Sequence, residues 1–167
     1  GGRIGLHSQT TLGSRFWFEV PLPAINGATA AKGPAASAPA SDACLQGRRI
    51  LVAEDNPVNM LITTAILEQA GATVLPASDG ARAVGVMRQS MHQGLRIDAV
   101  LMDIQMPGMD GYETTKALRR LQPTYEGPVV AMTAGITRDE IEAAQAHGLT
   151  DLVGKPIDRD ELLGLLA

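Results

Sequence analysis

The stretch AVLMDIQMPGMDGYE, residues 99–113, begins with apolar residues that suit a buried β-strand and then places an aspartate, Asp103, at the end of that strand. A buried carboxylate without a partner is costly, so we expect Asp103 at the rim of a sheet, where water or a cation can reach it. The residues that follow, IQMPG, do not start a helix, which makes Asp103 a poor match for a helix-capping aspartate. Asp103 is therefore the first candidate functional residue.

The composition fits one ordinary domain with additional segments. The chain has 167 residues, of which 45% are hydrophobic, and a formal net charge of −4 at pH 7. It lacks the clustered Lys and Arg that nucleic-acid binding requires, so we expect a protein partner and no nucleic acid. The single cysteine fits a reducing compartment, and no apolar run reaches the roughly 18 residues needed to cross a bilayer. These features predict a cytoplasmic location without membrane contact by this part of the protein.

A segment rich in Ala, Gly, Pro and Ser separates two parts of different character. This segment, residues 24–47, has too few large apolar residues to offset the entropy lost on ordering, and it predicts a disordered linker. Before it, residues 1–23 contain two strand-like runs, Arg3 to Ser8 and Arg15 to Leu22, joined by a segment with Gly13 and Ser14. This pattern predicts a β-hairpin. A lone hairpin is marginal in water, so we interpret it as the edge of a larger sheet.

The third part, residues 48–167, alternates short apolar runs with segments of helical periodicity. Five such strand-helix units predict an α/β fold, a doubly wound five-stranded parallel sheet with helices on both faces. The predicted strands are Arg49 to Ala53, Thr73 to Ala77, Ile97 to Met102, Pro128 to Thr133 and Asp151 to Gly154.

Several helix starts are visible in the same part of the chain. Pro57 suits a first helical position, and the residues after it give the first helix a broad apolar side, composed of Val58, Leu61, Ile62, Ala65 and Leu67. Asp79, Asp110 and Asp158 each stand just before a helix and are interpreted as caps. Thr137 and Glu140 have the spacing of a capping box.

The strand ends bring together polar residues of matching chemistry. In an open parallel sheet, ligands bind outside the carboxyl ends of the strands. The residues that the strands deliver to that edge are Glu54, Asp55, Asp103, Thr133 and Lys155. Three converging carboxylates repel one another, and a bound divalent cation removes that cost. Oxygen ligands suit a hard cation, so the sequence predicts a Mg²⁺ site.

The remaining groups predict phosphoryl chemistry beside the metal. Mg²⁺ takes only one or two protein carboxylates as a rule, which leaves another carboxylate free to react. The hydroxyl of Thr133 and the ammonium of Lys155 complete a cradle for a tetrahedral anion. Such a site can hold a phosphoryl group during its transfer to Asp103.

The motifs of this part resemble those of response-regulator receiver domains. The matching stretches are LVAEDNPVN, VLMDIQMPGMDG, VVAMTA and VGKPI, in the order and spacing of that family. The resemblance covers residues 48–167 and implies a flavodoxin-like sheet with the strand order 2-1-3-4-5. It also implies that Asp103 accepts a phosphoryl group from a phosphohistidine, and that Thr133 and Lys155 contact the phosphoryl oxygens.

The same resemblance implies the ligands of the metal. Asp55, Asp103 and the backbone carbonyl of Gln105 would bind Mg²⁺, and Glu54 would act through a metal-bound water.

The N-terminal part has a resemblance of its own. The segments GGRIGL and GSRFWFEVPLP are similar to the last strands of the ATP-binding domain of sensor histidine kinases. The nucleotide-binding motifs of that domain would lie upstream, so no ATP site is assigned, and whether the chain counts as an enzyme stays open. Together the two resemblances imply a hybrid sensor histidine kinase. The implied partners are the phosphohistidine domain of a kinase and a downstream histidine-phosphotransfer domain.

Three other functions share this architecture. A haloacid-dehalogenase-like phosphatase also uses a strand-end Asp, but it needs a second acid two residues later, where this chain has Gln105. A flavodoxin-like flavin binder would need a hydroxyl- and glycine-rich loop in the place of Glu54 and Asp55, whose charges repel a phosphate. A receiver that is not phosphorylated and serves only for docking is disfavoured, because every residue needed for phosphorylation is present.

Overall fold

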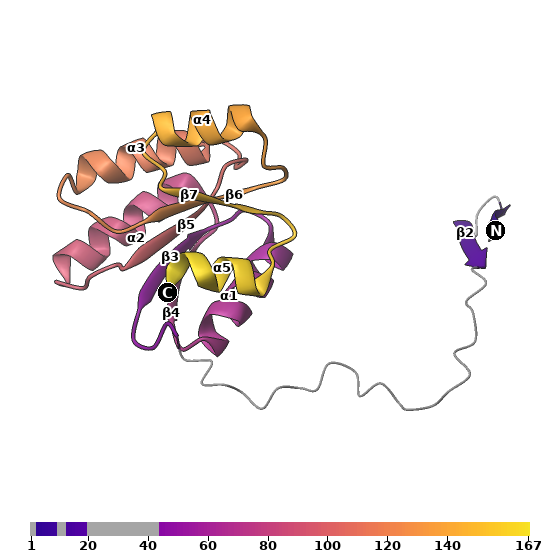
Figure 1. Cartoon of the computed structure of the whole chain (residues 1–167), viewed down its shortest axis with the longest axis horizontal. Helices are drawn as coiled ribbons and strands as arrows, with labels where there is room; N and C mark the ends of the chain where they lie inside the picture. Colours follow the sequence, from indigo (N-terminus) through magenta and orange to yellow (C-terminus); the bar gives the residue numbers. More distant parts are fainter. Residues whose placement is uncertain (1–2, 10–12, 20–43) are drawn as a thin grey trace. The chain divides into compact units, whose positions relative to one another are not determined.

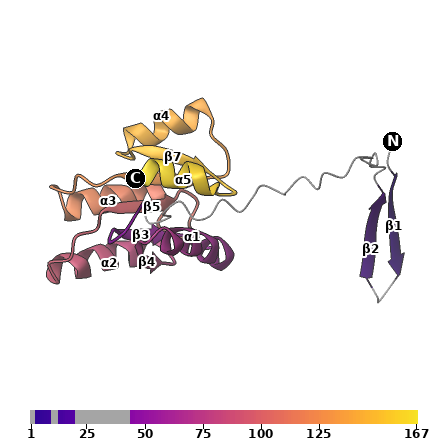
Figure 2. The ribbon, with the colours of Figure 1, turned by 60° about the horizontal axis from the view of Figure 1, so that its bottom comes forward.

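The computed structural model of the chain describes residues 3–9, 13–19 and 44–167, which belong to two compact units, residues 1–40 and 41–167 (Figure 1). In the first unit, β1 (Arg3–Gln9) pairs with β2 (Gly13–Glu19) as an antiparallel hairpin (Figure 2). The second strand begins earlier than predicted, because Gly13 and Ser14 pair with β1 and do not form the connection. Residues 20–22 of that predicted strand and residues 24–43 of the predicted linker lie outside the described residues.

The second unit contains a five-stranded parallel sheet, as the sequence predicts. Its order is β4-β3-β5-β6-β7, which is the expected order 2-1-3-4-5 within this unit. The strands are β3 (Arg49–Ala53), β4 (Thr73–Ala77), β5 (Ala99–Asp103), β6 (Val129–Thr133) and β7 (Asp151–Gly154). Three strands have the predicted bounds, whereas β5 and β6 start one or two residues later than predicted. In β5 the strand also runs one residue further and includes Asp103.

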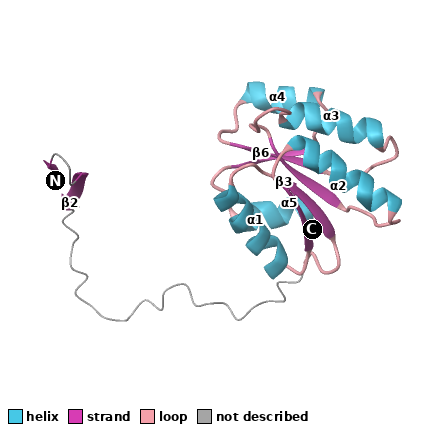
Figure 3. Ribbon diagram, turned by 180° about the vertical axis from the view of Figure 1, so that it is seen from behind, coloured by secondary structure: helices cyan, strands magenta, loops and turns pink. Residues whose placement is uncertain are grey.

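Helices cover both faces of this sheet (Figures 1 and 3). The helices are α1 (Pro57–Gln69), α2 (Gly80–His92), α3 (Gly111–Leu121), α4 (Arg138–Ala146) and α5 (Arg159–Leu166). One buried cluster joins α2, α3 and α4 to one face of the sheet, and a second joins α1 and α5 to the other face. The central strands are buried on both faces, which explains their nearly continuous apolar sequences.

The predicted capping residues lie at the helix starts. The side chains of Asp79, Asp110 and Asp158 accept backbone N–H groups at the first turns of α2, α3 and α5. At α4, Thr137 and Glu140 form a complete capping box. These bonds satisfy N–H groups that have no partner within the helix, and they fix where each helix begins relative to the strand before it.

The apolar side predicted for α1 does not face the core. Leu67 is fully buried, but Val58, Leu61 and Ile62 are 62%, 70% and 49% exposed, and Ala65 is exposed as well. The apolar residues of α1 are spread around the helix, but only one side of it can contact the sheet. That side carries Thr63 and Leu67. Of the five residues that give α1 its broad apolar side, only Leu67 is therefore buried in the core.

The folded unit also includes the last residues of the predicted linker. Residues 44–47 form a turn in which Leu45 is fully buried in the cluster of α1 and α5. The backbone N–H of Leu45 donates to the carbonyl oxygen of Ala70 at 3.0 Å. The folded unit therefore extends upstream of residue 48, to a large apolar residue within a segment of small and polar residues.

Candidate functional site

The candidate site lies at the carboxyl ends of the strands. Glu54 follows β3, Asp103 is the last residue of β5, and both are nearly buried, with exposed fractions of 1% and 4%. Asp55 is exposed beside them. Carboxylate oxygens of these three residues all lie within 4.8 Å of one another. The structure therefore brings the three predicted acidic residues together.

Lys155 contacts two of these carboxylates. Its Nζ lies 2.7 Å from Oε2 of Glu54 and 2.7 Å from Oδ2 of Asp103. The lysine follows β7, and its backbone N–H donates to the carbonyl oxygen of Thr133 at 2.7 Å, which ties the end of β6 to the same site. Oε1 of Glu54 accepts two further hydrogen bonds, one from the backbone N–H of Asn56 and one from the side-chain amide of Asn59, each at 3.2 Å. The ammonium is thus fixed between the two buried acids.

The surroundings shift the ionisation of both partners. Burial raises the pKa of Asp103, and the hydrogen bonds from Lys155 and from the backbone N–H of Gln105 offset this only in part. For Lys155, burial lowers the pKa, but the hydrogen bonds to Asp103 and Glu54 together with the negative charges of these two residues outweigh burial, and the net pKa is raised. Lys155 therefore remains a cation at neutral pH. One ammonium cannot neutralise three carboxylates, so the site keeps an excess of negative charge.

This excess charge and the donor set fit a hard divalent cation. Within the described part of the chain, Asp55 has no hydrogen bond or ion pair, and its exposed carboxylate adjoins the two buried ones. Carboxylate oxygens are the ligands that Mg²⁺ prefers. Gln105 reaches the site through its backbone N–H, which donates to Oδ1 of Asp103 at 3.0 Å. The predicted role of its carbonyl oxygen as a ligand stays a prediction.

Thr133 lies at the end of β6, next to the site, but its hydroxyl points elsewhere. Its Oγ1 is 3.0 Å from Oε1 of Glu140 and 3.0 Å from the carbonyl oxygen of Gly135. Among the hydrogen bonds of the described residues, none joins Thr133 to Asp103. The sequence identified Glu140 only as a capping residue, and its spacing from Thr133 gave no sign of this contact.

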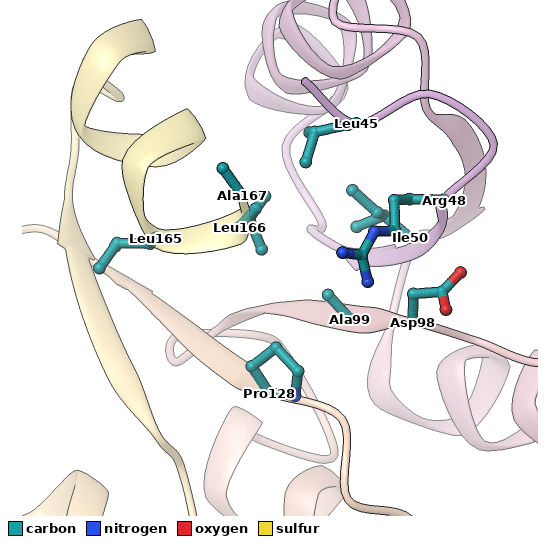
Figure 4. Close-up of a pocket in the computed structure, with 9 residues that line it drawn as sticks. All are labelled: Leu45, Arg48, Ile50, Asp98, Ala99, Pro128, Leu165, Leu166 and Ala167. Carbon is teal, nitrogen blue, oxygen red and sulfur yellow. The ribbon is translucent and has the colours of Figure 1, made fainter. Parts of the chain in front are cut away.

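A cavity lies at the opposite edge of the sheet. It has a volume of about 220 Å³ and is lined by residues at the amino ends of β3, β5 and β6 and by the end of α5 (Figure 4). The lining residues are Leu45, Arg48, Ile50, Asp98, Ala99, Pro128, Leu165, Leu166 and Ala167. None of the predicted site residues lines this cavity.

An apolar surface adjoins the carboxylate site. The exposed side chains of Val58, Leu61 and Ile62 belong to α1, which begins two residues after Asp55. Ile62 also lines a small cavity of about 70 Å³ between α1 and the segment that follows β7, together with Lys155. A protein that covers this surface would reach the site at the same time.

In the ranges that the structure describes, no helix combines the length and the apolar character needed to cross a membrane.

Comparisons with known proteins identify the family to which this chain is similar. Residues 50–167 match the response regulator receiver domain family. Sensor histidine kinase AruS of Pseudomonas aeruginosa is 35% identical over 164 residues, which are 97% of this chain and 15% of the length of AruS. Sensor histidine kinase GacS of Pseudomonas protegens is 37% identical over 117 residues, 68% of this chain and 12% of GacS.

Solved structures show the same fold. The receiver domain of sensor histidine kinase PA1611 from Pseudomonas aeruginosa PAO1, solved with a magnesium ion coordinated in the active site cleft, has a TM-score of 0.63 and 35% identity, covering 72% of this chain and 94% of that one. The receiver domain of histidine kinase CKI1 from Arabidopsis thaliana, complexed with Mg²⁺ and BeF₃⁻, has a TM-score of 0.66 and 28% identity, covering 75% and 91%. By its sequence, its fold and the family match over residues 50–167, this chain belongs to the response regulator receiver domain family.

Proposed function

We propose that this chain accepts a phosphoryl group from a phosphohistidine onto Asp103, with Mg²⁺ bound, as part of a phosphorelay. The observation that supports this most directly is the contact of Lys155 with both Asp103 and Glu54 beside the exposed carboxylate of Asp55. A site built only for stability would not leave three carboxylates with one ammonium, since the unpaired charge costs free energy.

In the proposed reaction, a carboxylate oxygen of Asp103 attacks the phosphorus of the donor. The new bond is a P–O bond to Asp103, and the bond that breaks is the P–N bond to the imidazole. The imidazole nitrogen keeps the electron pair of that bond and takes a proton from solvent. Lys155 already lies 2.7 Å from Oδ2 of Asp103, where its charge offsets that of the arriving phosphoryl oxygens.

The residues that would hold Mg²⁺ are Asp55, Asp103 and the carbonyl of Gln105, with Glu54 acting through a water. When bound, the metal would supply positive charge next to the phosphoryl oxygens. Glu54 suits an indirect role, because Lys155, Asn56 and Asn59 already occupy its oxygens. Asp55 suits a direct role, because its carboxylate has no partner among the described residues.

We infer further that the parent protein is a hybrid sensor histidine kinase. The similarity to AruS covers 97% of this chain, so it includes residues upstream of the receiver. The hairpin of β1 and β2 fits the last strands of a kinase ATP-binding domain, followed by a linker and a receiver at residues 48–167. The phosphoryl donor would be the phosphohistidine domain of a kinase, and the acceptor a histidine-phosphotransfer domain, either of which could dock on the exposed apolar residues of α1. A cytoplasmic location fits the lone cysteine and this chemistry.

Phosphate incorporation from a small donor tests the proposal. The protein is incubated with acetyl phosphate, with and without Mg²⁺, and its intact mass is measured before and after treatment with hydroxylamine. We expect Mg²⁺-dependent addition of one phosphoryl group that hydroxylamine removes, and no addition to Asp103→Asn. Undiminished labelling of Asp103→Asn, or a label that resists hydroxylamine, would refute the assignment of Asp103.

A further inference from the structure

The hydroxyl of Thr133 has a single proton, and that proton is already engaged. The two acceptors within reach of it are Oε1 of Glu140 and the carbonyl oxygen of Gly135, both at 3.0 Å. The same oxygen accepts the backbone N–H of Gly135 at 3.4 Å. A hydroxyl donates only one hydrogen bond, so Thr133 cannot donate to Glu140 or Gly135 and to a phosphoryl oxygen at the same time.

The backbone of Thr133 is fixed, which leaves rotation of the side chain as its main freedom. Its Cα pairs with Gly154 of β7, and its carbonyl accepts from Lys155 at 2.7 Å. The preceding residue, Met132, pairs with Asp103 itself. The hydroxyl is therefore one side-chain rotation away from the edge where Asp103 ends its strand.

Glu140 is held at the same time by the start of α4. Its Oε2 accepts both the backbone N–H and the hydroxyl of Thr137, each at 3.0 Å. The capping box uses Oε2 only, so Oε1 is left for Thr133. The hydrogen bond from the Thr137 backbone lowers the pKa of Glu140 most, and the hydrogen bond from Thr133 is the next largest cause. The carboxylate of Glu140 is therefore ionised at neutral pH.

We propose that Glu140 is a positioning residue that holds the Thr133 hydroxyl away from Asp103 until a phosphoryl group competes for it. The inference rests on the proposed function, because it requires Thr133 to contact the phosphoryl oxygens. In the phosphorylated domain the Thr133–Glu140 bond is broken, and Glu140 keeps only its bonds to Thr137. Glu140 thereby sets how readily the site closes around the phosphoryl group, and it transmits that closure to the first turn of α4.

The variant Glu140→Gln separates this role from capping. Gln also serves at the third position of a capping box, so the start of α4 is preserved. Its amide has one acceptor oxygen where the carboxylate has two, and hydrogen bonds to a charged acceptor are roughly twice as strong as those to a neutral one. Gln can therefore keep the cap but holds Thr133 less firmly. Asp139→Asn is the matched control, because it removes a charge from the same exposed turn without contacting Thr133.

The experiment measures binding of beryllofluoride, which imitates a phosphoryl group, in the presence of Mg²⁺. The amide shifts of Ala134 and Gly135 are followed by NMR for the whole chain, and melting temperatures verify that each variant folds. We expect Glu140→Gln to bind about threefold to tenfold more tightly than the wild type, and Asp139→Asn to stay within about twofold. In a Thr133→Ala background, Glu140→Gln should leave the affinity for beryllofluoride unchanged, because the residue through which Glu140 acts is absent.

Three results would overturn the inference. These are an unchanged affinity in Glu140→Gln, an equal gain in Asp139→Asn, or the same gain in the Thr133→Ala background. A wild-type protein that neither binds beryllofluoride nor takes up phosphate would instead refute the proposed function, and the role of Glu140 with it.

Discussion

The Asp103 carboxylate occupies a position that disfavours its charge. It is nearly buried, it lies beside Glu54, and the single ammonium of Lys155 is shared between the two. Burial is the main reason that its pKa is raised. The folded protein therefore binds a proton at Asp103 more tightly than the unfolded chain does, and the free energy of unfolding falls as the pH rises through the pKa of the folded state. The proposed reactivity of Asp103 therefore comes at the expense of stability.

We predict that Asp103→Asn melts at a higher temperature than the wild type at pH 7. The substitution removes the disfavoured charge and leaves Lys155 paired with Glu54. The difference should shrink as the pH is lowered and Asp103 becomes protonated, and Mg²⁺ should raise the melting temperature of the wild type more than that of the variant. Thermal melting between pH 4 and pH 8 measures all three. A variant that is less stable at pH 7, or a gap that widens in acid, would contradict this account of the site.

A second prediction separates the two neighbouring acids. Asp55→Ala should weaken Mg²⁺ binding by about 100-fold, because it removes both a charge and a ligand, whereas Glu54→Gln should weaken it by about tenfold or less. The structural reason is that Glu54 is already bonded to Lys155 and Asn59, whereas Asp55 has no partner in the described part of the chain. Isothermal titration of both variants measures the two losses. Equal losses would show that the division of roles is wrong.

For the individual residues of the site, the sequence predicts which residues lie close together, but it does not predict how their side chains are oriented. Asp103, Glu54 and Lys155 converge because parallel strands deliver their carboxyl ends to one edge, and this follows from the pattern alone. The orientation of the Thr133 hydroxyl depends on competition among acceptors, one of which is seven residues further along on α4. No spacing rule encodes such a contact.

At the scale of elements, the start of α3 lies unusually close to the end of β5. The backbone N–H of Gly111 donates to the carbonyl of Ile104 at 3.1 Å, and a Cβ at position 111 would clash with the backbone of Asp103 and Ile104. The glycine in the stretch MPGMDGYE is thus required by close approach of two backbones. It allows α3 to begin against the backbone at the end of β5, where Asp103 lies.

We predict that Gly111→Ala destabilises the domain by about 1–3 kcal/mol, since backbone atoms must move to accept the methyl group. Gly85→Ala is the matched control, because position 85 lies in the middle of α2 with open space around its Cβ. That substitution should stabilise the domain by about 0.5–1 kcal/mol through helix propensity. Urea unfolding of both variants measures the two effects. Equal effects of the two substitutions would rule out the close approach at Gly111.

The helix α1 shows why faces are harder to predict than elements. Its position and its proline start follow from the sequence, but its apolar residues are spread around the helix. Such a pattern does not specify which side packs against the sheet. The exposed residues Val58, Leu61 and Ile62 are the side of the helix on which we propose that a protein partner docks.

For the whole molecule, the alternation of strands and helices was sufficient to predict a parallel sheet with helices on both faces, whereas the order of its strands was implied by the resemblance to receiver domains. The boundary of the folded unit was less predictable. Composition placed it at residue 48, but Leu45 is fully buried and belongs to the core. An averaged composition does not register one buried leucine.

This boundary gives a prediction for two truncations. Removal of residues 1–40, which form a separate compact unit, should leave the melting temperature of the receiver within about 2 °C of that of the whole chain. Removal of residues 1–46 also removes Leu45, and loss of a buried leucine costs at least about 2 kcal/mol, which lowers the melting temperature by roughly 5 °C or more. Calorimetry of the whole chain and of the two truncated forms measures the three melting temperatures. Equal melting of the two truncated forms would show that Leu45 contributes nothing to stability.

Direct mapping of the acyl phosphate tests, without any mutation, whether Asp103 carries the phosphoryl group. After reaction with acetyl phosphate and Mg²⁺, treatment with borohydride reduces an aspartyl phosphate to homoserine, and peptide mass spectrometry locates the converted position. We predict conversion at position 103 and at no other aspartate. Conversion at Asp55 or Asp110, or phosphate uptake without conversion at position 103, would contradict the proposal that Asp103 is the phosphoryl acceptor.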